Sequence, residues 1–505
     1  FALGNRFRGG DTVQNVTGVM DFQFGLYRIQ PTGAADHTAA NPRTAAPEPI
    51  GGDLRVAAMN TLNFFLTQDY PSGNSLDNKC GPAQNVECRG ADFDQPTEFT
   101  RQRDKLLAAL AGLDADVLGL NELENTTGVD PLEDATSGIV PGLNAMLGAG
   151  TYASINTGTI GPDAIRVGLI YKSAKVTPLG SFQVLDSSDD PRFIDTKSRP
   201  ALAQTFEENE TGARFTIVVN HLKSKGSACD DVGDPDAGDG QGNCNGTRTL
   251  AAQALVDWLA TDPTGSGDPD FLIMGDLNSY AQEDPIDAIK AGPDDSAGTS
   301  DDYTNLIAQH QGAFAYSFVF DGQAGYLDHA LASPSLAAQV TGAADWHINA
   351  DEPDVLDYDT SFKPPAQDAL YEPNAYRSSD HDPVVIGLSP IWHFTGFFQP
   401  VDNPTVFNTV RAGQGVPVKF SLSGNQGLGI FAPGYPKSEA IACTPGAPTD
   451  GIETTAAGKS GLTYDRDTDT YTYVWKTTKT WANTCRQLVL KLKDGTVHTA
   501  YFRFM

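Results

Sequence analysis

The sequence contains no long hydrophobic run. No apolar stretch among its 505 residues approaches the ~18 residues that a bilayer-spanning helix needs. No transmembrane helix is therefore expected. The sequence also begins at Phe1 without a methionine and shows no signal peptide, so a processed or trimmed product is expected.

Basic residues are scarce. The chain carries 34 Lys and Arg against 64 Asp and Glu, which gives a net charge of −30. Such a field repels polyanions, so a nucleic-acid substrate requires a local basic patch or bridging cations. Solubility in a salty extracellular setting explains the acidity without any function. With 40% hydrophobic residues, 51 Gly and 32 Pro, the composition is typical of two or three globular domains with many loops.

Cysteine is also rare, and its spacing excludes a C-x-x-C zinc knuckle. The six cysteines fall into three successive pairs in loop-rich or β-like segments. Three disulfides are predicted, which implies an oxidising compartment and a secreted protein. The alternative is a cytosolic protein with six buried thiols. The predicted pairs are Cys80 with Cys88, Cys229 with Cys244, and Cys443 with Cys485.

Three domains are predicted from the changes in pattern. Residues 1–49 contain one or two strands, followed by a linker rich in Pro, Ala, Gly and Thr, and are interpreted as the end of a truncated β domain. Residues 50–389 alternate apolar strands with amphipathic helices, which indicates a layered α/β domain. Residues 390–505 are rich in Thr, Val and Tyr with turn signals, which predicts a β-sandwich.

Polar side chains follow several apolar strands of the middle domain, as in "FLIMGDLNSY". A single Asp at a strand end is usually a turn former or a helix cap. A whole set of acids, amides and imidazoles suggests instead that the strand ends converge on one rim, where ligand sites are built. The set comprises Asn60, Glu122, His221, Asp276, Asn278, Asp328, Asp380 and His381.

These residue types indicate a particular chemistry. Carboxylate and amide oxygens without cysteine favour a hard cation such as Mg²⁺, Mn²⁺ or Ca²⁺. Two histidines are suited to general acid and base roles. A cation lowers the pKa of a bound water and neutralises charge on a phosphoryl oxygen. The set therefore predicts hydrolysis of phosphate esters.

Six motifs carry a resemblance to a known family. They are, in order, "RVAAMNTLNF", "LGLNELEN", "VVNHLKSKG", "IMGDLNSY", "YLDHALAS" and "SSDHDPVV". Over residues 54–388 the chain resembles the endonuclease/exonuclease/phosphatase (DNase I-like) superfamily, and most of all large bacterial extracellular nucleases. The resemblance implies a four-layer α/β/β/α sandwich. It also implies that "TGVMDFQFGLYRIQPT" is the end of a small β-barrel-like (OB-like) domain.

The resemblance further implies roles for individual residues. Glu122, with Asn60 and Asp380, would hold a catalytic Mg²⁺ or Mn²⁺ against the scissile phosphate. Asp276 would orient or deprotonate the attacking water, and Asn278 would bind a phosphate oxygen.

The two histidines and two lysines receive roles in the same way. His381, paired with Asp328, would contact the phosphate and stabilise its developing charge. His221 would protonate the leaving oxygen or bind phosphate. Lys223 and Lys225 immediately follow His221 and are the favoured phosphate contacts in an otherwise acidic chain. Arg101, Arg103 and Arg248 are further candidates for a basic rim.

One position departs from the family pattern. In the deoxyribonuclease branch a glutamate near the strand "RVGLIYK" pairs with the equivalent of His221, whereas here that register offers Ile165. Asp163 is the candidate substitute. In the same strand, Arg166 and Tyr171 are candidate substrate contacts, although an aromatic in a half-buried strand is equally typical of packing.

Two further segments leave alternatives open. The acidic loop between Cys229 and Cys244 either chelates a structural Ca²⁺ or is simply solvated, and it does not match EF-hand spacing. The segment "TGFFQPVDNPTVFNTVRAGQGVPVKFSLSG" resembles the start of an Ig-like domain appended to secreted bacterial enzymes. Such a domain would bind a surface or polymer, or act as a spacer.

Three functions compete at this stage. The first is a secreted, metal-dependent nuclease acting on DNA, with RNA left open as a further substrate. The second is a phosphomonoesterase or phospholipid phosphodiesterase on the same fold. A membrane-docking enzyme of that kind needs an exposed aromatic hairpin, for which "WHFTGFF" at 392–398 is the one candidate, in the domain linker. The third is a non-catalytic, calcium-binding secreted protein.

Overall fold

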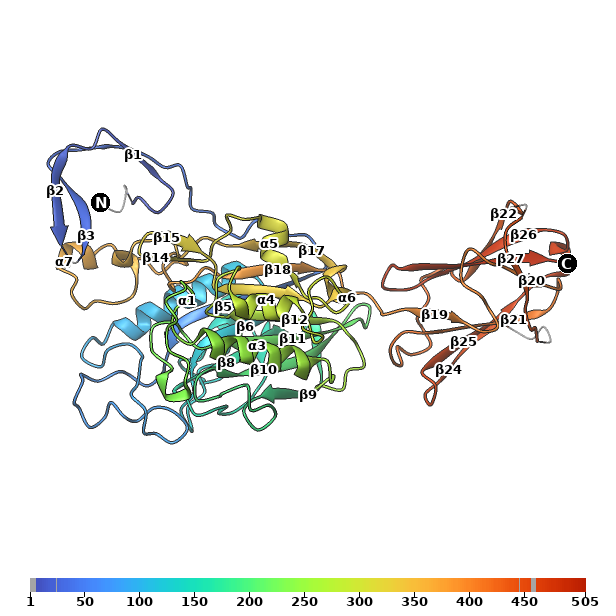
Figure 1. Ribbon diagram of the computed structural model, residues 1–505, viewed down its shortest axis with the longest axis horizontal. Helices are drawn as coiled ribbons and strands as arrows, with labels where there is room; N and C mark the ends of the chain where they lie inside the picture. Colours follow the sequence, from blue (N-terminus) through green and yellow to red (C-terminus); the bar gives the residue numbers. More distant parts are fainter. Residues whose placement is uncertain (1–5, 24, 445, 456–459) are drawn as a thin grey trace. The chain divides into compact units, whose positions relative to one another are not determined.

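The computed structural model describes residues 6–23, 25–444, 446–455 and 460–505, which are mostly β with few helices (Figure 1). The chain divides into two compact units. None of the helices among the described residues is both long and apolar enough to cross a membrane. The first unit comprises Phe1–Thr205, Thr216–Thr264 and Asp270–Ser389; the second comprises Phe206–Phe215, Gly265–Pro269 and Pro390–Met505.

Two six-stranded sheets form the body of the first unit. The first sheet contains, in spatial order, β17 (Val340–Asp345), β18 (Val384–Leu388), β5 (Leu54–Phe64), β6 (Val117–Glu124), β8 (Ile165–Lys172) and β7 (Tyr152–Ser154). The second sheet contains β13 (Thr304–Asn305), β16 (Asp328–Ala332), β12 (Phe271–Asp276), β11 (Arg214–His221), β10 (Arg199–Glu208) and β9 (Val176–Leu185).

Each sheet buries its apolar residues against a different pair of helices. Helices α1 (Glu98–Leu113) and α2 (Ile139–Leu147) share a core with β5 and β6 of the first sheet. Helices α3 (Asn245–Leu259) and α4 (Asp284–Lys290) share a core with β11 and β12 of the second sheet (Figure 1). Three short helices complete the unit: α5 (Leu306–Gln311), α6 (Pro334–Ala337) and α7 (Pro365–Asp368).

The two sheets meet closely between β6 and β11. A Cβ atom added at Gly119 would lie 2.8 Å from Val219 Cγ2, so only glycine fits there. The Asn121 side chain donates a hydrogen bond to the Asn220 carbonyl oxygen at 2.7 Å. These contacts bring the carboxyl ends of β5, β6, β11 and β12 to one edge of the unit.

The segment before β5 is not a free linker. Strands β1 (Thr12–Gln14) and β4 (Asp36–Thr38) pair with each other, as do β2 (Gly18–Gln23) and β3 (Leu26–Pro31). In the part predicted as linker, Arg43 forms an ion pair with the buried Glu352 at 2.6 Å. The sequence analysis did not predict this contact, because the composition of a Pro- and Ala-rich stretch does not indicate a single long-range ion pair.

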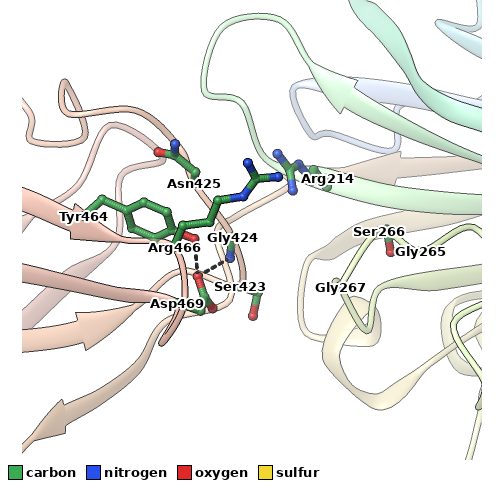
Figure 2. A pocket seen from close by; sticks show the side chains of 10 residues that line it. All are labelled: Arg214, Gly265, Ser266, Gly267, Ser423, Gly424, Asn425, Tyr464, Arg466 and Asp469. Atoms are coloured by element: carbon green, nitrogen blue, oxygen red, sulfur yellow. Dashed lines mark hydrogen bonds between the residues drawn. The ribbon is translucent and has the colours of Figure 1, made fainter.

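The second unit contains a four-stranded and a five-stranded sheet around one core. Asp469 stabilises one end by accepting hydrogen bonds from the Tyr464 hydroxyl at 2.8 Å and the Gly424 amide at 3.0 Å (Figure 2). The first of these sheets has β19 (Thr395–Phe398), β21 (Gly415–Ser421), β25 (Thr470–Lys476) and β24 (Gly461–Asp465). The other has β22 (Lys437–Ile441), β26 (Cys485–Lys491), β27 (Val497–Phe504), β20 (Phe407–Val410) and β23 (Thr449–Gly451).

All three predicted disulfides are present. The sulfur–sulfur distances are 2.06 Å for Cys80–Cys88, 2.11 Å for Cys229–Cys244 and 1.98 Å for Cys443–Cys485. The described residues contain no free cysteine. The pairing is consistent with an extracellular protein.

Candidate active site

Three adjacent strands of the second sheet place polar side chains in one row. His221 on β11 is the register partner of Asp276 on β12, and Asp276 is the partner of Asp328 on β16. Register partners on neighbouring strands project to the same face of a sheet. The row therefore forms the base of a candidate site.

Glu122 reaches this row from the first sheet. The pairing of β6 with its neighbours is interrupted around Glu122, whose φ is +62°. A bulge of this kind redirects a side chain out of the regular alternation. The Asn63 amide holds the Glu122 carboxylate at 2.9 Å, and Glu122 Oε1 lies 3.8 Å from His221 Nε2.

Asp276 is held by groups from both sheets. Its Oδ1 accepts a hydrogen bond from the Asn278 amide at 2.8 Å, and its Oδ2 accepts one from the Asn60 side chain at 3.4 Å. Burial raises the pKa of Asp276 to about 7, with a further contribution from the negative charge of Asp328, while the positive charge of His381 opposes the rise. This carboxyl group is held in place by hydrogen bonds, and its pKa lies near neutral pH. It is therefore suited to accepting and releasing a proton.

The structure gives the two candidate histidines opposite electrostatic environments. Burial and the positive charge of Arg199 lower the pKa of His221 well below its usual value. Its Nδ1 is buried and lacks a hydrogen-bond partner among the described residues. Burial also disfavours protonation of His381, but the negative charges of Asp328, Asp380 and Asp276 outweigh it and raise the pKa of His381 well above its usual value.

A chain of hydrogen bonds orients His381. Its Nδ1 lies 2.7 Å from Asp328 Oδ2, and the Ser317 hydroxyl donates to the same oxygen at 2.7 Å. The Phe318 ring packs 4.6 Å from the imidazole, centroid to centroid. With Nδ1 engaged, Nε2 is the nitrogen left to contact a substrate.

Glu122, Asp380 and Asn60 fit a small hard cation. Burial raises the pKa of Glu122, and the nearby charge of Asp380 raises it further. A bound cation would relieve this repulsion. Among the described residues no three Asp, Glu, His or Cys side chains enclose a metal site. Mg²⁺ does not need such a cage, because it binds through one or two carboxylates and keeps its waters and substrate oxygens.

A cavity of about 630 Å³ opens beside these residues. Asn278 and His381 line it together with aromatic side chains of the hairpin formed by β14 (Phe318–Phe320) and β15 (Gln323–Gly325). Lys225 also lines it, with its ammonium 4.7 Å from the Tyr280 ring centroid and in contact with the Glu283 carboxylate. The cavity therefore combines a cation, an imidazole and aromatic faces.

Comparison with known families assigns the chain. The Endonuclease/Exonuclease/phosphatase family model matches residues 83–381, which is more than half of the sequence. The chain belongs to this family. The family is named for endonucleases, exonucleases and phosphatases, which are hydrolases of phosphoester bonds. No curated protein matched the chain.

Several solved structures of family members are similar to the chain. The human Nocturnin catalytic domain with bound sulfate is 15% identical, with a TM-score of 0.36, over 66% of this chain and 93% of that chain. ANGEL2, a 2',3'-cyclic phosphatase, is 14% identical with a TM-score of 0.38, covering 66% and 95%. Staphylococcus aureus beta toxin with bound magnesium ions is 12% identical with a TM-score of 0.33, covering 66% and 99%.

The two predicted substrate contacts on β8 lie at different distances from Glu122. Tyr171 is paired with Val117 at the start of β6, whereas Glu122 is near its end. Five residues of strand, about 17 Å, separate the two positions. Arg166 is buried, and its guanidinium lies 3.2 Å from the Thr157 hydroxyl. The prediction for Tyr171 could not allow for strand direction, which only the paired sheet defines. Arg166 pairs with Leu123, next to Glu122.

Asp163 does not act as the carboxylate partner of His221. Its carboxylate binds Arg89 at 2.9 Å and Arg199 at 3.1 Å. Arg248 is buried and does not form a basic rim, since it donates to the Asn243 carbonyl oxygen at 2.7 Å.

Lys223 is mostly buried next to His221. Its ammonium donates to the Ser224 carbonyl oxygen at 3.1 Å and also contacts the Ser227 hydroxyl. Burial and the charge of Arg199 lower the pKa of Lys223 to about 8. The lysine is therefore close to the site but held by its own loop.

In the acidic loop from Cys229 to Cys244, individual carboxylates bind different protein groups rather than one shared site. Asp231 pairs with Lys197 at 2.7 Å. Asp234 accepts hydrogen bonds from the Thr247 amide at 2.6 Å and hydroxyl at 2.7 Å, at the start of α3. These contacts favour the solvated interpretation of the loop over a shared Ca²⁺.

The sequence analysis missed residues that hold the site together. Asn121 and Asn220 directly precede Glu122 and His221, so their strand-end positions were a usable signal. A Cβ at Gly275 would lie 2.3 Å from the Asn220 carbonyl oxygen, which requires glycine at its φ of +116°. Ser317 offered no signal, because its role depends on meeting Asp328 across the fold.

A buried histidine beside the site predicts how stability depends on pH. His329 Nε2 lies 2.8 Å from the Ser279 carbonyl oxygen, and burial lowers the pKa of His329 to about 4. The unfolded chain binds this proton near pH 6.5 and the folded chain only near pH 4. Stability is therefore complete above pH 6.5 and falls as the pH drops towards 4, by about 3 kcal/mol at most.

Urea unfolding of the wild type and His329→Gln between pH 8 and 4 measures this effect. The variant should lose less stability on acidification. His310→Gln, an exposed histidine, should behave as the wild type does. Equal pH slopes for the wild type and His329→Gln would contradict the assignment.

Proposed function

We propose that the protein is a secreted bacterial nuclease that depends on Mg²⁺ or Mn²⁺ and hydrolyses phosphodiester bonds of extracellular DNA and RNA. One observation carries the proposal: His221, Asp276 and Asp328 form a single row, and Glu122 and His381 lie against it. Family membership supports phosphoester hydrolysis. The finer choice of substrate rests on the cavity beside the row.

In this mechanism the first group of residues acts on the metal and the water. Glu122, Asn60 and Asp380 would hold a cation, which would supply charge neutralisation at a phosphoryl oxygen. Asp276 orients the attacking water and accepts its proton. Asn278 binds a phosphate oxygen through its side-chain amide, now 3.1 Å from the Leu222 carbonyl oxygen.

The second group acts on the phosphate and the leaving oxygen. His381, oriented by Asp328, donates a hydrogen bond from Nε2 to the phosphate as negative charge develops. His221 donates to the leaving oxygen or binds phosphate, and Lys223 and Lys225 add positive charge. Water adds to phosphorus as its proton passes to Asp276, the bond from phosphorus to the leaving oxygen breaks, and the leaving oxygen takes a proton from His221 or from solvent.

The cavity supports a polynucleotide substrate. Phe318 and Tyr280 line it and offer ring faces next to His381. Stacking of a base on an aromatic ring contributes about 1–3 kcal/mol and tolerates any base. Lys225 is placed to meet an adjacent phosphate despite the net charge of −30.

Plasmid cleavage tests the proposal directly. The wild type should cleave supercoiled DNA with Mg²⁺ or Mn²⁺ and lose all activity in EDTA, whereas a chromogenic phosphomonoester should be a poor substrate. Cleavage of the monoester alone would favour a phosphatase. No cleavage of either would favour the non-catalytic binding protein.

A second candidate function is phospholipid phosphodiesterase activity. The hairpin of β14 and β15 lies beside the site and exposes 63% of Phe320, and nearby Phe314 is 95% exposed. Exposed aromatics of this kind suit insertion into a membrane interface. The sequence analysis was wrong to see only "WHFTGFF" as such a segment, because it did not predict this hairpin.

The two candidates differ in what Phe320→Ala should do. A nuclease should keep its kcat on short oligonucleotides, with a KM raised by the loss of a stacking surface at Phe320, whereas a membrane enzyme should lose vesicle binding and hydrolysis of phospholipid headgroups. Leu428→Ala, a comparably exposed apolar residue, is the matched control. Phospholipid hydrolysis by a wild type that leaves DNA intact would replace the nuclease assignment.

Finer features of the architecture belong to the same proposal. The two helix pairs and two sheets suit a four-layer α/β/β/α domain over residues 50–389. The two sheets of residues 390–505 suit an Ig-like module that binds a surface or polymer. The strands within 1–49 suit the end of an OB-like domain. Cell-surface or extracellular localisation follows from the disulfides.

A further inference from the structure

Asp77 is a buried carboxylate that lacks a hydrogen-bond partner among the described residues. It lies in the loop between β5 and α1 that the Cys80–Cys88 disulfide closes, and only 3% of it is exposed. Neither carboxylate oxygen has a hydrogen-bond partner among the described residues. A buried carboxylate in this state is strongly disfavoured.

A second buried acid, Glu124 at the end of β6, contacts the same loop and has hydrogen-bond partners there. Glu124 is fully buried, and it accepts hydrogen bonds from the Leu66 amide at 2.7 Å, the Thr67 amide at 3.0 Å and the Thr67 hydroxyl at 2.6 Å. The fold thus supplies hydrogen-bond donors that stabilise the buried Glu124 carboxylate. The Asp77 carboxylate differs because it has no such donor among the described residues.

Further negative charge lies close to Asp77. Burial raises the pKa of Asp69 to about 6, and the charges of Asp77, Asp92 and Glu87 raise it further. Across the described residues, no Lys, Arg or His forms an ion pair with either Asp69 or Asp77. The loop therefore concentrates carboxylates that form no ion pair with a Lys, Arg or His of the described residues.

Main-chain hydrogen bonds fix the positions of both acids. The Asp69 amide donates to the Ala91 carbonyl oxygen at 2.9 Å. The Cys88 amide donates to the Asp77 carbonyl oxygen at 2.8 Å. Both acids are thus tied to the segment 88–91, which fixes their backbone positions relative to each other.

We propose that this loop binds a structural Ca²⁺ through the carboxylates of Asp77 and Asp69, with main-chain carbonyls and water completing the shell. Ca²⁺ takes six to eight oxygens in flexible geometry, so two carboxylates are sufficient charge. This agrees with the lack of a three-acid cage among the described residues. The site is separate from the catalytic row and does not depend on the proposed function.

Thermal unfolding of the full chain tests the site in a Glu122→Gln background, which removes the expected catalytic cation. Addition of 5 mM Ca²⁺, a concentration of about 5–50 times the Kd of extracellular Ca²⁺ modules, should raise the Tm by about 3–5 °C. Asp77→Asn should abolish this shift. Asp94→Asn, an exposed acid in the same loop, should retain it.

Stability without calcium separates a metal ligand from a merely structural residue. In EDTA, Asp77→Asn should be at least as stable as its parent, because it removes an unbalanced buried charge. Equal destabilisation in EDTA and in Ca²⁺, or an unchanged Ca²⁺ shift, would overturn the proposal.

A second measurement covers the case in which Asp77→Asn does not fold. Tb³⁺ in place of Ca²⁺ should give luminescence sensitised by Tyr70, the neighbour of Asp69. The partly exposed Asp69→Asn should weaken Tb³⁺ binding at least tenfold. Unchanged Tb³⁺ affinity in Asp69→Asn would refute the site.

Discussion

Asp276→Ala is expected to lower kcat/KM for DNA cleavage by about 10³-fold, the range of a lost general base. Asp276 lies 3.5 Å from His221 Nε2 and in hydrogen-bond contact with Asn60 and Asn278, so it is central to the row. Initial rates on supercoiled plasmid with saturating Mg²⁺ measure the loss. A loss below tenfold would exclude Asp276 from proton transfer.

Asp276→Asn separates catalysis from folding. The substitution keeps the shape and one acceptor oxygen but removes a carboxyl group whose pKa burial raises to about 7. In EDTA at pH 8 the variant should therefore unfold at a Tm no lower than the wild type, while remaining inactive. Active-site residues commonly lower the stability of the folded protein in this way, because function requires them. Asp287→Asn, on the exposed surface of α4, should change neither property.

The pair of Asp328 and His381 should show the second large effect. His381→Ala is expected to reduce kcat about 10³-fold, because it removes a donor aimed at the developing charge. Asp328→Asn should cost about 10²-fold, since it leaves the imidazole in place but changes the partner of Nδ1 at 2.7 Å. Single-turnover rates on a labelled oligonucleotide measure both.

The double variant decides whether the pair acts as a unit. Asp328→Asn combined with His381→Ala should be no slower than His381→Ala alone, because the role of Asp328 passes through the imidazole. Ser317→Ala, which removes the 2.7 Å hydrogen bond to Asp328, should cost about tenfold or less. Additive losses in the double variant would mean that Asp328 contacts substrate by itself.

Local sequence patterns were sufficient for most of the secondary structure around the site. One of the amphipathic helices expected within residues 50–389 is α1, because the leucines of "EFTRQRDKLLAALAGL" repeat at helical spacing and all face the first sheet. The strand in "FLIMGD" is β12, since a short apolar run is what a strand buried on both faces requires. Chemistry that depends on residue type, such as disulfides and a set of hard-cation ligands, was visible in the same way.

Patterns that depend on strand direction were not predictable. Arg166 and Tyr171 are on the same strand as each other, yet only its antiparallel pairing with β6 shows that Tyr171 lies at the end away from Glu122. Asp163 was expected beside His221, but two arginines from other segments, Arg89 and Arg199, bind it instead. The position of Asp163 in the sequence does not indicate which distant arginines bind its carboxylate.

The sequence by itself therefore determined the family, the disulfide pairs and the set of polar residues from which a site could be built, because these depend on residue identity and order. Only the tertiary structure decided which of them meet. Register places His221, Asp276 and Asp328 in one row, and close packing leaves the Asp77 carboxylate buried without a hydrogen-bond partner among the described residues. Both facts arise from contacts between residues far apart in the chain, whose geometry no local pattern encodes.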